Sequence, residues 1–185
     1  MADPTFTLRP AEESDAALLL RIFAESHCAG FELMGLEPGT LAGLIEMQFQ
    51  ARQAQYRMHP GAADYLICRG AGSADSDGIA LGSCWLADTA EQLRVLDIAV
   101  LAEHRRRGIA RCVLSELCAR AAAQAKPVRL SVWHANAPAI ALYRALGFEP
   151  AGGAADSGET GDLGNGYLEL RFSATATTQH PAGAR

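Results

Sequence analysis

Three consecutive arginines and a glycine follow a strand-like run and precede a helical pattern. The run Leu93–Val100 is rich in β-forming residues, and helical spacing of apolar residues begins just after Gly108. A strand that turns into a helix aims unpaired backbone N–H groups and the positive end of the helix dipole at the space above the turn. Arginines 105–107 add positive charge there, and the glycine lets a ligand approach the backbone. The turn predicts a phosphate or pyrophosphate site, or else it is only a solvated connection.

A second helical pattern, at residues 136–146, carries an amide and a phenol on one face. Asn136 and Tyr143 lie seven positions apart, which is close to two full turns at 3.6 residues per turn. Both side chains can therefore reach one ligand. In the alternative interpretation, Asn136 only caps the helix and Tyr143 packs in the core with its hydroxyl satisfied.

The two segments together carry a family pattern. The first reads R-x-x-G-x-A, from Arg105 to Ala110, and the second reads N-x-P-A-x-x-L-Y-x-x-x-G-F over residues 136–148. This combination resembles the GNAT superfamily of N-acetyltransferases, and the resemblance extends over about residues 6–170. It implies an α/β (α+β) fold with a mixed, mostly antiparallel central sheet, flanked by helices, in which one pair of parallel strands splays apart.

The resemblance also implies where acetyl-CoA would bind. The pantetheine arm would enter between the splayed strands and pair with the backbones of Ile98 and Val100, while the arginine turn would hold the pyrophosphate. The Asn136 side chain would bond the arm of this co-substrate, and the Tyr143 hydroxyl would lie near the thioester sulfur. The cofactor-binding residues expected on this basis are Ile98, Val100, Arg105, Arg106, Arg107, Gly108, Ile109, Ala110, Asn136 and Tyr143.

The implied reaction is direct attack of an amine on an acyl thioester. It needs a deprotonated amine, a donor for the tetrahedral oxyanion and a proton for the departing thiolate. Tyr143 would be the general acid, and a backbone N–H of Leu93–Val100 the oxyanion donor. Asp97, an ionisable residue in an apolar strand, either takes the amine proton, directly or through water, or faces outward against a neighbour. His134 is a second candidate base or a solvated loop residue, and strand alternation puts Arg94 on the face opposite Asp97.

The acceptor side of the site carries no motif. The first half of the chain is expected to cover the sheet edge and to receive a small-molecule or peptide amine. Candidates for contact with a cationic amine are Glu32, Glu37 and Glu46, and candidate wall residues are Tyr56 and Trp85. Scattered acids of this kind are also typical of a solvated face. The competing functional hypothesis is a non-catalytic domain that senses acyl-CoA or serves as an interaction partner.

The elements that must position these residues follow from hydrophobic periodicity and turn signals. Strands are predicted at residues 5–9, 65–69, 79–86, 93–100, 128–133, 148–151 and 167–172, and helices at 16–24, 40–58, 109–125 and 136–146. Thr40 is the expected N-cap of the second helix. Residues 27–39, 70–78 and 152–166 are predicted loops. One domain is expected over residues 1–172, with a flexible tail at 173–185.

Composition excludes several other classes of protein. The chain has 185 residues, of which 49% are hydrophobic and 20% charged, as in a soluble domain. No apolar run is long enough to span a membrane and no signal peptide is evident, so a cytoplasmic location is expected. The net charge of −5 and the single basic cluster argue against nucleic acid. Five cysteines without a C-x-x-C pair predict reduced core residues and no metal site. A homodimer is left open.

Overall fold

The computed structural model describes residues 6–28, 30–69, 78–151 and 166–173. Within these residues the strands are β1 (Phe6–Pro10), β2 (Ala62–Arg69), β3 (Ile79–Asp88), β4 (Leu93–Val100), β5 (Val128–Trp133), β6 (Glu149–Pro150) and β7 (Tyr167–Phe172). The α-helices are α1 (Ala16–His27), α2 (Pro38–Arg57), α3 (Ile109–Ala123) and α4 (Ala137–Ala145), and the short 3-10 helices are η1 (Glu13–Asp15), η2 (Phe31–Met34) and η3 (Ala102–His104). The predicted loops at 70–78 and 152–166 and the predicted tail fall almost entirely outside the described residues.

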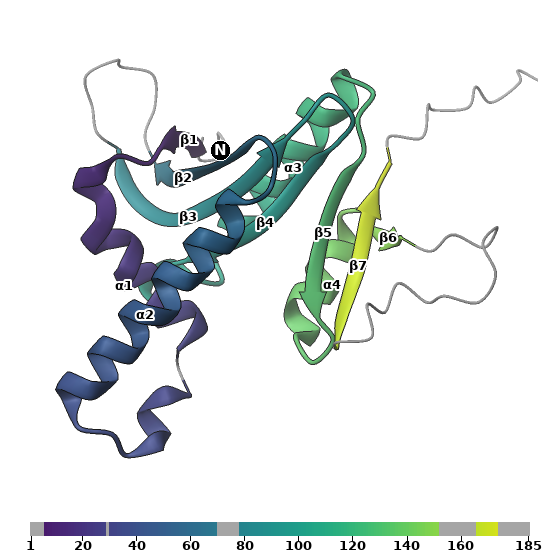
Figure 1. Cartoon of the computed structure of the whole chain (residues 1–185). Coiled ribbons are helices and arrows are strands. Elements are labelled where there is room, and N and C mark those ends of the chain that lie inside the picture. Colours follow the sequence, from purple (N-terminus) through teal and green to yellow (C-terminus); the bar gives the residue numbers. More distant parts are fainter. Residues whose placement is uncertain (1–5, 29, 70–77, 152–165, 174–185) are drawn as a thin grey trace, which may run out of the picture.

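The strands form one mixed sheet in the order β1-β2-β3-β4-β5-β7-β6. Every neighbouring pair is antiparallel except β4 and β5, which run parallel and are joined through α3. Helices α1 and α2 lie over one face of the sheet, and α3 and α4 lie over the other (Figure 1). This architecture confirms the predicted mixed, mostly antiparallel sheet flanked by helices.

Each face of the sheet buries its own apolar cluster. The larger cluster lies between the sheet and helices α3 and α4, and its fully buried members include Leu93, Leu114 and Leu130. The smaller cluster includes Ile22 of α1 and Leu66 of β2, on the opposite face. Side chains that alternate along β4 and β5 thus enter different layers, which fixes the direction in which each polar residue of these strands points.

The predicted cysteine roles agree with this packing. None of the five cysteines forms a disulfide within the described residues, and four of them are buried, where they act as small apolar residues. The described residues contain no group of three or more His, Cys, Asp or Glu side chains arranged to hold a metal ion. No helix among them combines the length and the apolar character needed to cross a membrane.

Two predicted boundaries on the α1–α2 side are wrong, and both affect the site. Helix α1 continues one turn beyond residue 24, so His27 ends the helix instead of opening a loop. The predicted loop at 27–39 contains η2, and α2 already begins at Pro38, with Glu37 in the N-cap position. Thr40 is therefore inside the helix. Proline at the first helical position costs no hydrogen bond and has a helical φ, so it starts the helix before the threonine.

Candidate active site

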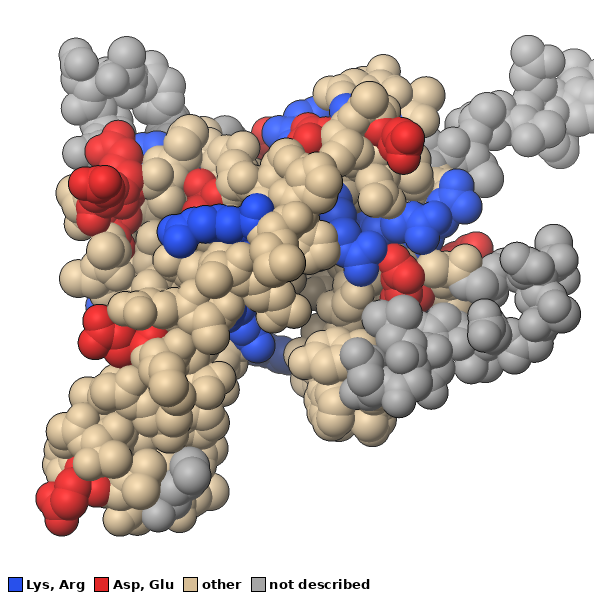
Figure 2. Space-filling view, in the orientation of Figure 1, with Lys and Arg blue, Asp and Glu red and all other residues tan. Residues whose placement is uncertain are grey.

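The parallel strands β4 and β5 separate after three residue pairs. Their register joins Leu93 to Val128, Arg94 to Arg129 and Val95 to Leu130, and the pairing ends there. Beyond this point the strands diverge in Figure 1, and a cavity of about 630 Å³ lies between them. The cavity is lined by residues 95–100 of β4, by residues 130–133 of β5, and by side chains of α1, α2 and α4. Figure 2 shows a hollow between the part of the molecule that contains β4 and the part that contains β5, with Lys or Arg atoms visible at the hollow.

The backbone of β4 presents hydrogen-bonding groups to this cavity. The Leu101 N–H donates to the Leu81 carbonyl at 2.9 Å, so these residues form a hydrogen-bonded pair of the antiparallel ladder. Such pairs alternate along the ladder, which makes Ala99 and Ser83 the next one. The N–H and C=O groups of Ile98 and Val100 then point away from β3, toward the space that β5 has left. These are the two residues that the sequence assigned to pantetheine.

The arginine turn lies at the end of β4 beside a second cavity of about 470 Å³. Arg106 and Gly108 have left-handed φ values of 61° and 77°, and α3 begins immediately afterwards at Ile109. An ideal Cβ on Gly108 would meet nothing within 4 Å, so the open space in front of this backbone is not filled by protein. The lining of this cavity includes His104, Arg105, Arg106, Gly108, Ile109, Ala110, Arg111 and Asn136.

The two cavities adjoin each other, and together they are called the channel. Val100, Arg105, Asn136 and Pro138 line both of them. The arginines of the channel differ from expectation in one respect, because Arg107 is exposed and does not line it. Arg111 lines the channel instead. It lies in the first turn of α3, three residues after Gly108 and on the same side of the helix, so helical spacing alone would have indicated it.

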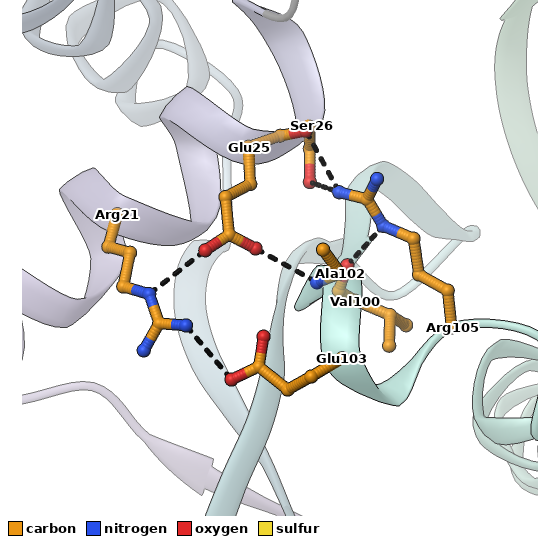
Figure 3. Close-up of polar contacts among 7 residues, drawn as sticks. All are labelled: Arg21, Glu25, Ser26, Val100, Ala102, Glu103 and Arg105. Carbon is orange, nitrogen blue, oxygen red and sulfur yellow. Dashed lines mark hydrogen bonds and ion pairs between the residues drawn. The ribbon is translucent and has the colours of Figure 1, made fainter.

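The Arg105 side chain bonds protein carbonyls. Its Nε donates to the Val100 carbonyl at 2.8 Å, and its Nη2 donates to the Glu25 carbonyl at 2.9 Å and to the Ser26 hydroxyl at 3.2 Å. Glu25 in turn accepts a hydrogen bond from the Ala102 N–H at 2.8 Å (Figure 3). Arg105 therefore joins the end of β4 to the last turn of α1, and the Val100 carbonyl has its partner within the protein.

Helix α4 places Asn136 and Tyr143 on the channel. The Asn136 side-chain oxygen accepts a hydrogen bond from the Ala139 N–H at 3.2 Å, so this residue is the N-cap of α4 and also lines both cavities. Tyr143 is 8% exposed and lines the larger cavity. Burial, with smaller contributions from Asp97 and Cys84, raises the pKa of Tyr143 to about 12, which keeps the phenol protonated.

Asp97 lies in a chain of hydrogen bonds that the sequence did not reveal. His27 Nε2 is 3.2 Å from the Asp97 carboxylate, and Arg52 Nη1 is 2.8 Å from His27 Nδ1. Arg52 Nη1 also lies 3.3 Å from His27 Nε2. Because a guanidinium can only donate and a carboxylate can only accept, the shorter contacts suit a ring that accepts at Nδ1 and donates from Nε2 to Asp97. All three side chains line the larger cavity. The side chains come from α1, α2 and β4, and no sequence spacing connects them.

A bulge in β4 overturns the predicted position of Arg94. Trp85 pairs with Asp97 but the next residue of β3, Leu86, pairs with Val95, so Leu96 is an extra residue. Both Val95 and Ile98 therefore pack against the α3-side cluster although they are three residues apart. Arg94 and Asp97, three apart themselves, share the opposite face. Because simple alternation ignores bulges, it placed them on different faces.

Arg94 links three strands close to the point where β4 and β5 separate. Its guanidinium bonds Glu169 of β7 at 2.9 Å and the Ser131 hydroxyl of β5 at 3.0 Å. These bonds cross the last paired residues of the splayed strands, where they hold the two halves of the sheet together.

The other predicted acceptor-side residues divide into two groups. Tyr56 lines the larger cavity, and its ring lies 5.5 Å from that of Trp85, which is buried and lines a small adjoining cavity. Glu37 and Glu46 are exposed and do not line the channel, and the side chain of Glu32 lies outside the described part. His134 is also exposed, with Nδ1 2.8 Å from the Gly166 carbonyl, which fits the solvated-loop interpretation.

Comparisons with known proteins converge on one family. Residues 70–150 match the family model described as acetyltransferase (GNAT) domain, a segment that includes β3, β4, the arginine turn, α3, β5 and α4. No curated protein matches the chain. An acetyltransferase from Thermus thermophilus is similar with a TM-score of 0.57 at 23% identity, over 91% of this chain and 97% of that chain.

Two further solved structures share the fold at lower identity. The PaiA N-acetyltransferase from Thermoplasma acidophilum, in complex with coenzyme A, has a TM-score of 0.60 at 12% identity, over 91% of this chain and 99% of that chain. The ribosomal-protein-S18-alanine N-acetyltransferase from Escherichia coli has a TM-score of 0.57 at 19% identity, over 95% of this chain and 99% of that chain.

Proposed function

Starting from the membership of this chain in the GNAT superfamily of acetyltransferases, we propose that it transfers the acetyl group of acetyl-CoA to an amine. One observation carries the proposal. The two adjoining cavities of the channel extend from the arginine turn to the gap between β4 and β5, where Tyr143 and Asp97 line the larger one. The channel therefore joins a surface suited to a pyrophosphate to groups suited to acyl transfer. We assign the activity to a single domain over residues 1–172.

The channel fits acetyl-CoA as the donor. The turn before α3 offers unpaired N–H groups, and Arg106 and Arg111 supply positive charge beside them, which suits a pyrophosphate. Beyond it, the Ile98 C=O and the Val100 N–H lie where an extended pantetheine arm would pair with β4, which leaves the Ile98 N–H for the reacting thioester. The PaiA structure contains coenzyme A, in agreement with this assignment. Asn136 would bond the arm with its side-chain NH₂, since its oxygen caps α4.

The proposed reaction is a single transfer of the acetyl group from the CoA sulfur to the amine nitrogen. The nitrogen of the neutral amine attacks the thioester carbonyl carbon, the C–N bond forms, and the C–S bond of the tetrahedral intermediate breaks. The Ile98 N–H is our candidate for the oxyanion donor, because it points into the gap. Tyr143 gives its proton to the departing thiolate. A high phenol pKa suits this role, because the group arrives protonated at every physiological pH.

Asp97 is the proposed base, and His27 keeps it in place. The amine proton passes to the Asp97 carboxylate directly or through one water molecule. The carboxylate accepts a hydrogen bond from His27 Nε2, whose ring is oriented by Arg52. His27 and Arg52 therefore act as positioning residues for the carboxylate in this scheme. The acceptor is a primary amine of a small molecule or a peptide, the second being the kind that the Escherichia coli relative acetylates.

Thiol release tests this function directly. The purified chain is mixed with acetyl-CoA and a panel of amines that includes amino acids, polyamines and a short peptide, and free CoA is measured together with the mass of the acetylated amine. We expect stoichiometric release of CoA and formation of an amide for at least one class. Tight CoA binding by calorimetry, without acetylated product for any amine, would instead support the acyl-CoA sensor.

A further inference from the structure

Arg52 lies in the acceptor half of the channel and makes contacts beyond its hydrogen bond to His27. Its guanidinium carbon lies 5.6 Å from the centre of the Phe23 ring and 6.0 Å from that of the Tyr56 ring. These aromatic rings restrict the side chain, while the residue lines both the main cavity and the small cavity next to it. A cation that is held by rings and opens on a cavity is arranged to meet a ligand.

Among the described residues, no carboxylate pairs with the charge of Arg52. Arg52 forms no ion pair within this part of the chain, whereas Arg94 pairs with Glu169, and Arg21 with Glu25 and Glu103. The Nη1 atom contacts the His27 ring, but a guanidinium has five N–H donors in a planar fork. Such a fork matches the two oxygens of a carboxylate.

We propose that the acceptor is an amino carboxylic acid, whose carboxylate is bound by Arg52 while its amine lies at Asp97. This inference rests on the proposed acetyltransferase function. A single imidazole ring, that of His27, separates the guanidinium from the Asp97 carboxylate. The cation and the anion thus lie on either side of one ring, in an order complementary to the amine and the carboxylate of an amino acid bound between them.

The remaining walls of the cavity suit the side chain of such an acceptor. Tyr56, Trp133 and Tyr167 line it, so flat apolar surface lies near the charged pair. Aromatic walls bind apolar and aromatic groups well. Amino acids with aromatic side chains are therefore the first acceptors to test, and each has a matched amine that lacks only the carboxylate.

The experiment compares those matched pairs. Rates of CoA release are measured with phenylalanine against phenethylamine and with tryptophan against tryptamine, for the wild type and for Arg52→Met, Arg52→Lys and Arg57→Met. Arg57 is the control, because it lies on the same helix, is exposed, and bonds only Gln53. Melting temperature and CoA affinity are recorded for each variant, so that loss of folding is separated from loss of recognition. The Lys variant keeps the charge and carries the test where the Met variant does not fold.

The expected result is a preference that depends on Arg52. The wild type should have kcat/KM at least about tenfold higher for each amino acid than for its matched amine. Arg52→Met should abolish this preference, Arg52→Lys should retain part of it, and Arg57→Met should not change it. Wild-type turnover of plain amines with no such preference would overturn this inference alone. An equal loss for both members of a pair in Arg52→Met would also overturn it, because it would assign Arg52 only to positioning His27. No turnover of any amine would overturn the proposed function as well.

Discussion

The two ends of the channel are built from different parts of the polypeptide. The donor end presents mainly backbone: the edge of β4, the turn with left-handed Arg106 and Gly108, and the first N–H groups of α3. The acceptor end presents side chains, above all His27, Arg52 and Asp97, which three separate elements bring together through hydrogen bonds. A surface made of backbone changes little when one side chain is replaced, whereas a surface made of side chains changes with each replacement.

This difference separates two kinds of kinetic effect. Substitutions at the acceptor end should alter turnover and the choice of amine while CoA affinity stays constant. Substitutions at the donor end should alter CoA affinity, by small factors, since each removes one charge and leaves the backbone in place. Tyr143 lies between the two ends of the channel, and Arg105 connects them. Substitutions at these two residues therefore show how far the two kinds of kinetic effect can be separated.

Replacing Tyr143 should have the largest effect. Tyr143→Phe removes the proposed proton donor without emptying the buried site, so kcat should fall about 100-fold or more while CoA affinity is unchanged. The measurement is thiol release at saturating acetyl-CoA. Because the pKa of Tyr143 is raised to about 12, wild-type turnover should show no loss from this group up to about pH 10. Tyr65→Phe, which changes a tyrosine packed against the core outside the channel, is the control. Equal rates for both variants would remove Tyr143 from the chemistry.

Replacing Asp97 should have the next largest effect, confined to the acceptor end. Asp97→Asn removes the proposed base and its negative charge, so kcat/KM for the amine should fall about 10- to 100-fold near neutral pH. The loss should shrink as the pH rises and more of the free amine is already neutral. Calorimetry should give unchanged CoA affinity. Glu46→Gln, an exposed carboxyl on α2, is the control and should not change kcat/KM. A large loss of CoA affinity in Asp97→Asn would break the separation between the two ends.

The same contrast explains what the sequence could predict. The arginine turn and the Asn136–Tyr143 pair are local patterns, in which a few neighbouring residues specify the geometry. The structure brings these residues to one channel. The mixed, mostly antiparallel sheet and its splayed pair of parallel strands followed from the resemblance that these patterns carry. Asp97 stood out because it is an acid in an apolar strand.

The acceptor end could not be predicted in the same way. His27 is 70 positions from Asp97 and 25 from Arg52, and only the packing of α1 and α2 on the sheet joins them. The sequence also placed His27 in a loop, because nothing in the residues after Ala24 signals the extra helical turn. The Leu96 bulge was equally hidden, since a single extra residue leaves the apolar pattern of the strand nearly intact.

Two adjacent arginines should then have unequal effects at the donor end. Arg106→Ala removes an exposed charge from the channel lining, so KM for acetyl-CoA should rise a fewfold, less at high salt, with no change in melting temperature. Arg105→Ala instead breaks three hydrogen bonds that join β4 to α1. We expect a loss of about 1 kcal/mol, or about 2–4 °C in melting temperature, and a rise in KM for both substrates. Identical behaviour of the two variants would refute a connecting role for Arg105.

The smallest expected effect concerns Asp64, on the floor of the acceptor end. Asp64 faces the small cavity that Asp97 also lines, and its Oδ1 has no hydrogen-bond partner among the described residues. Burial, together with the nearby charge of Asp97, raises the pKa of Asp64 to about 7. The folded state thus favours the protonated acid, so this contribution to stability is present below about pH 4 and is lost as the pH rises through 7.

Asp64→Asn cannot ionise, so the variant should gain melting temperature relative to the wild type as the pH rises from about 6 to 8, by about 2–4 °C. Thermal melts at constant ionic strength measure this, with Glu46→Gln as the exposed control. The amide leaves an unpaired oxygen at every pH, and that cost cancels when the two pH values are compared. A difference that does not change with pH would mean that the Asp64 carboxyl is already ionised near pH 6, and that the acceptor end tolerates two negative charges on one face of the sheet.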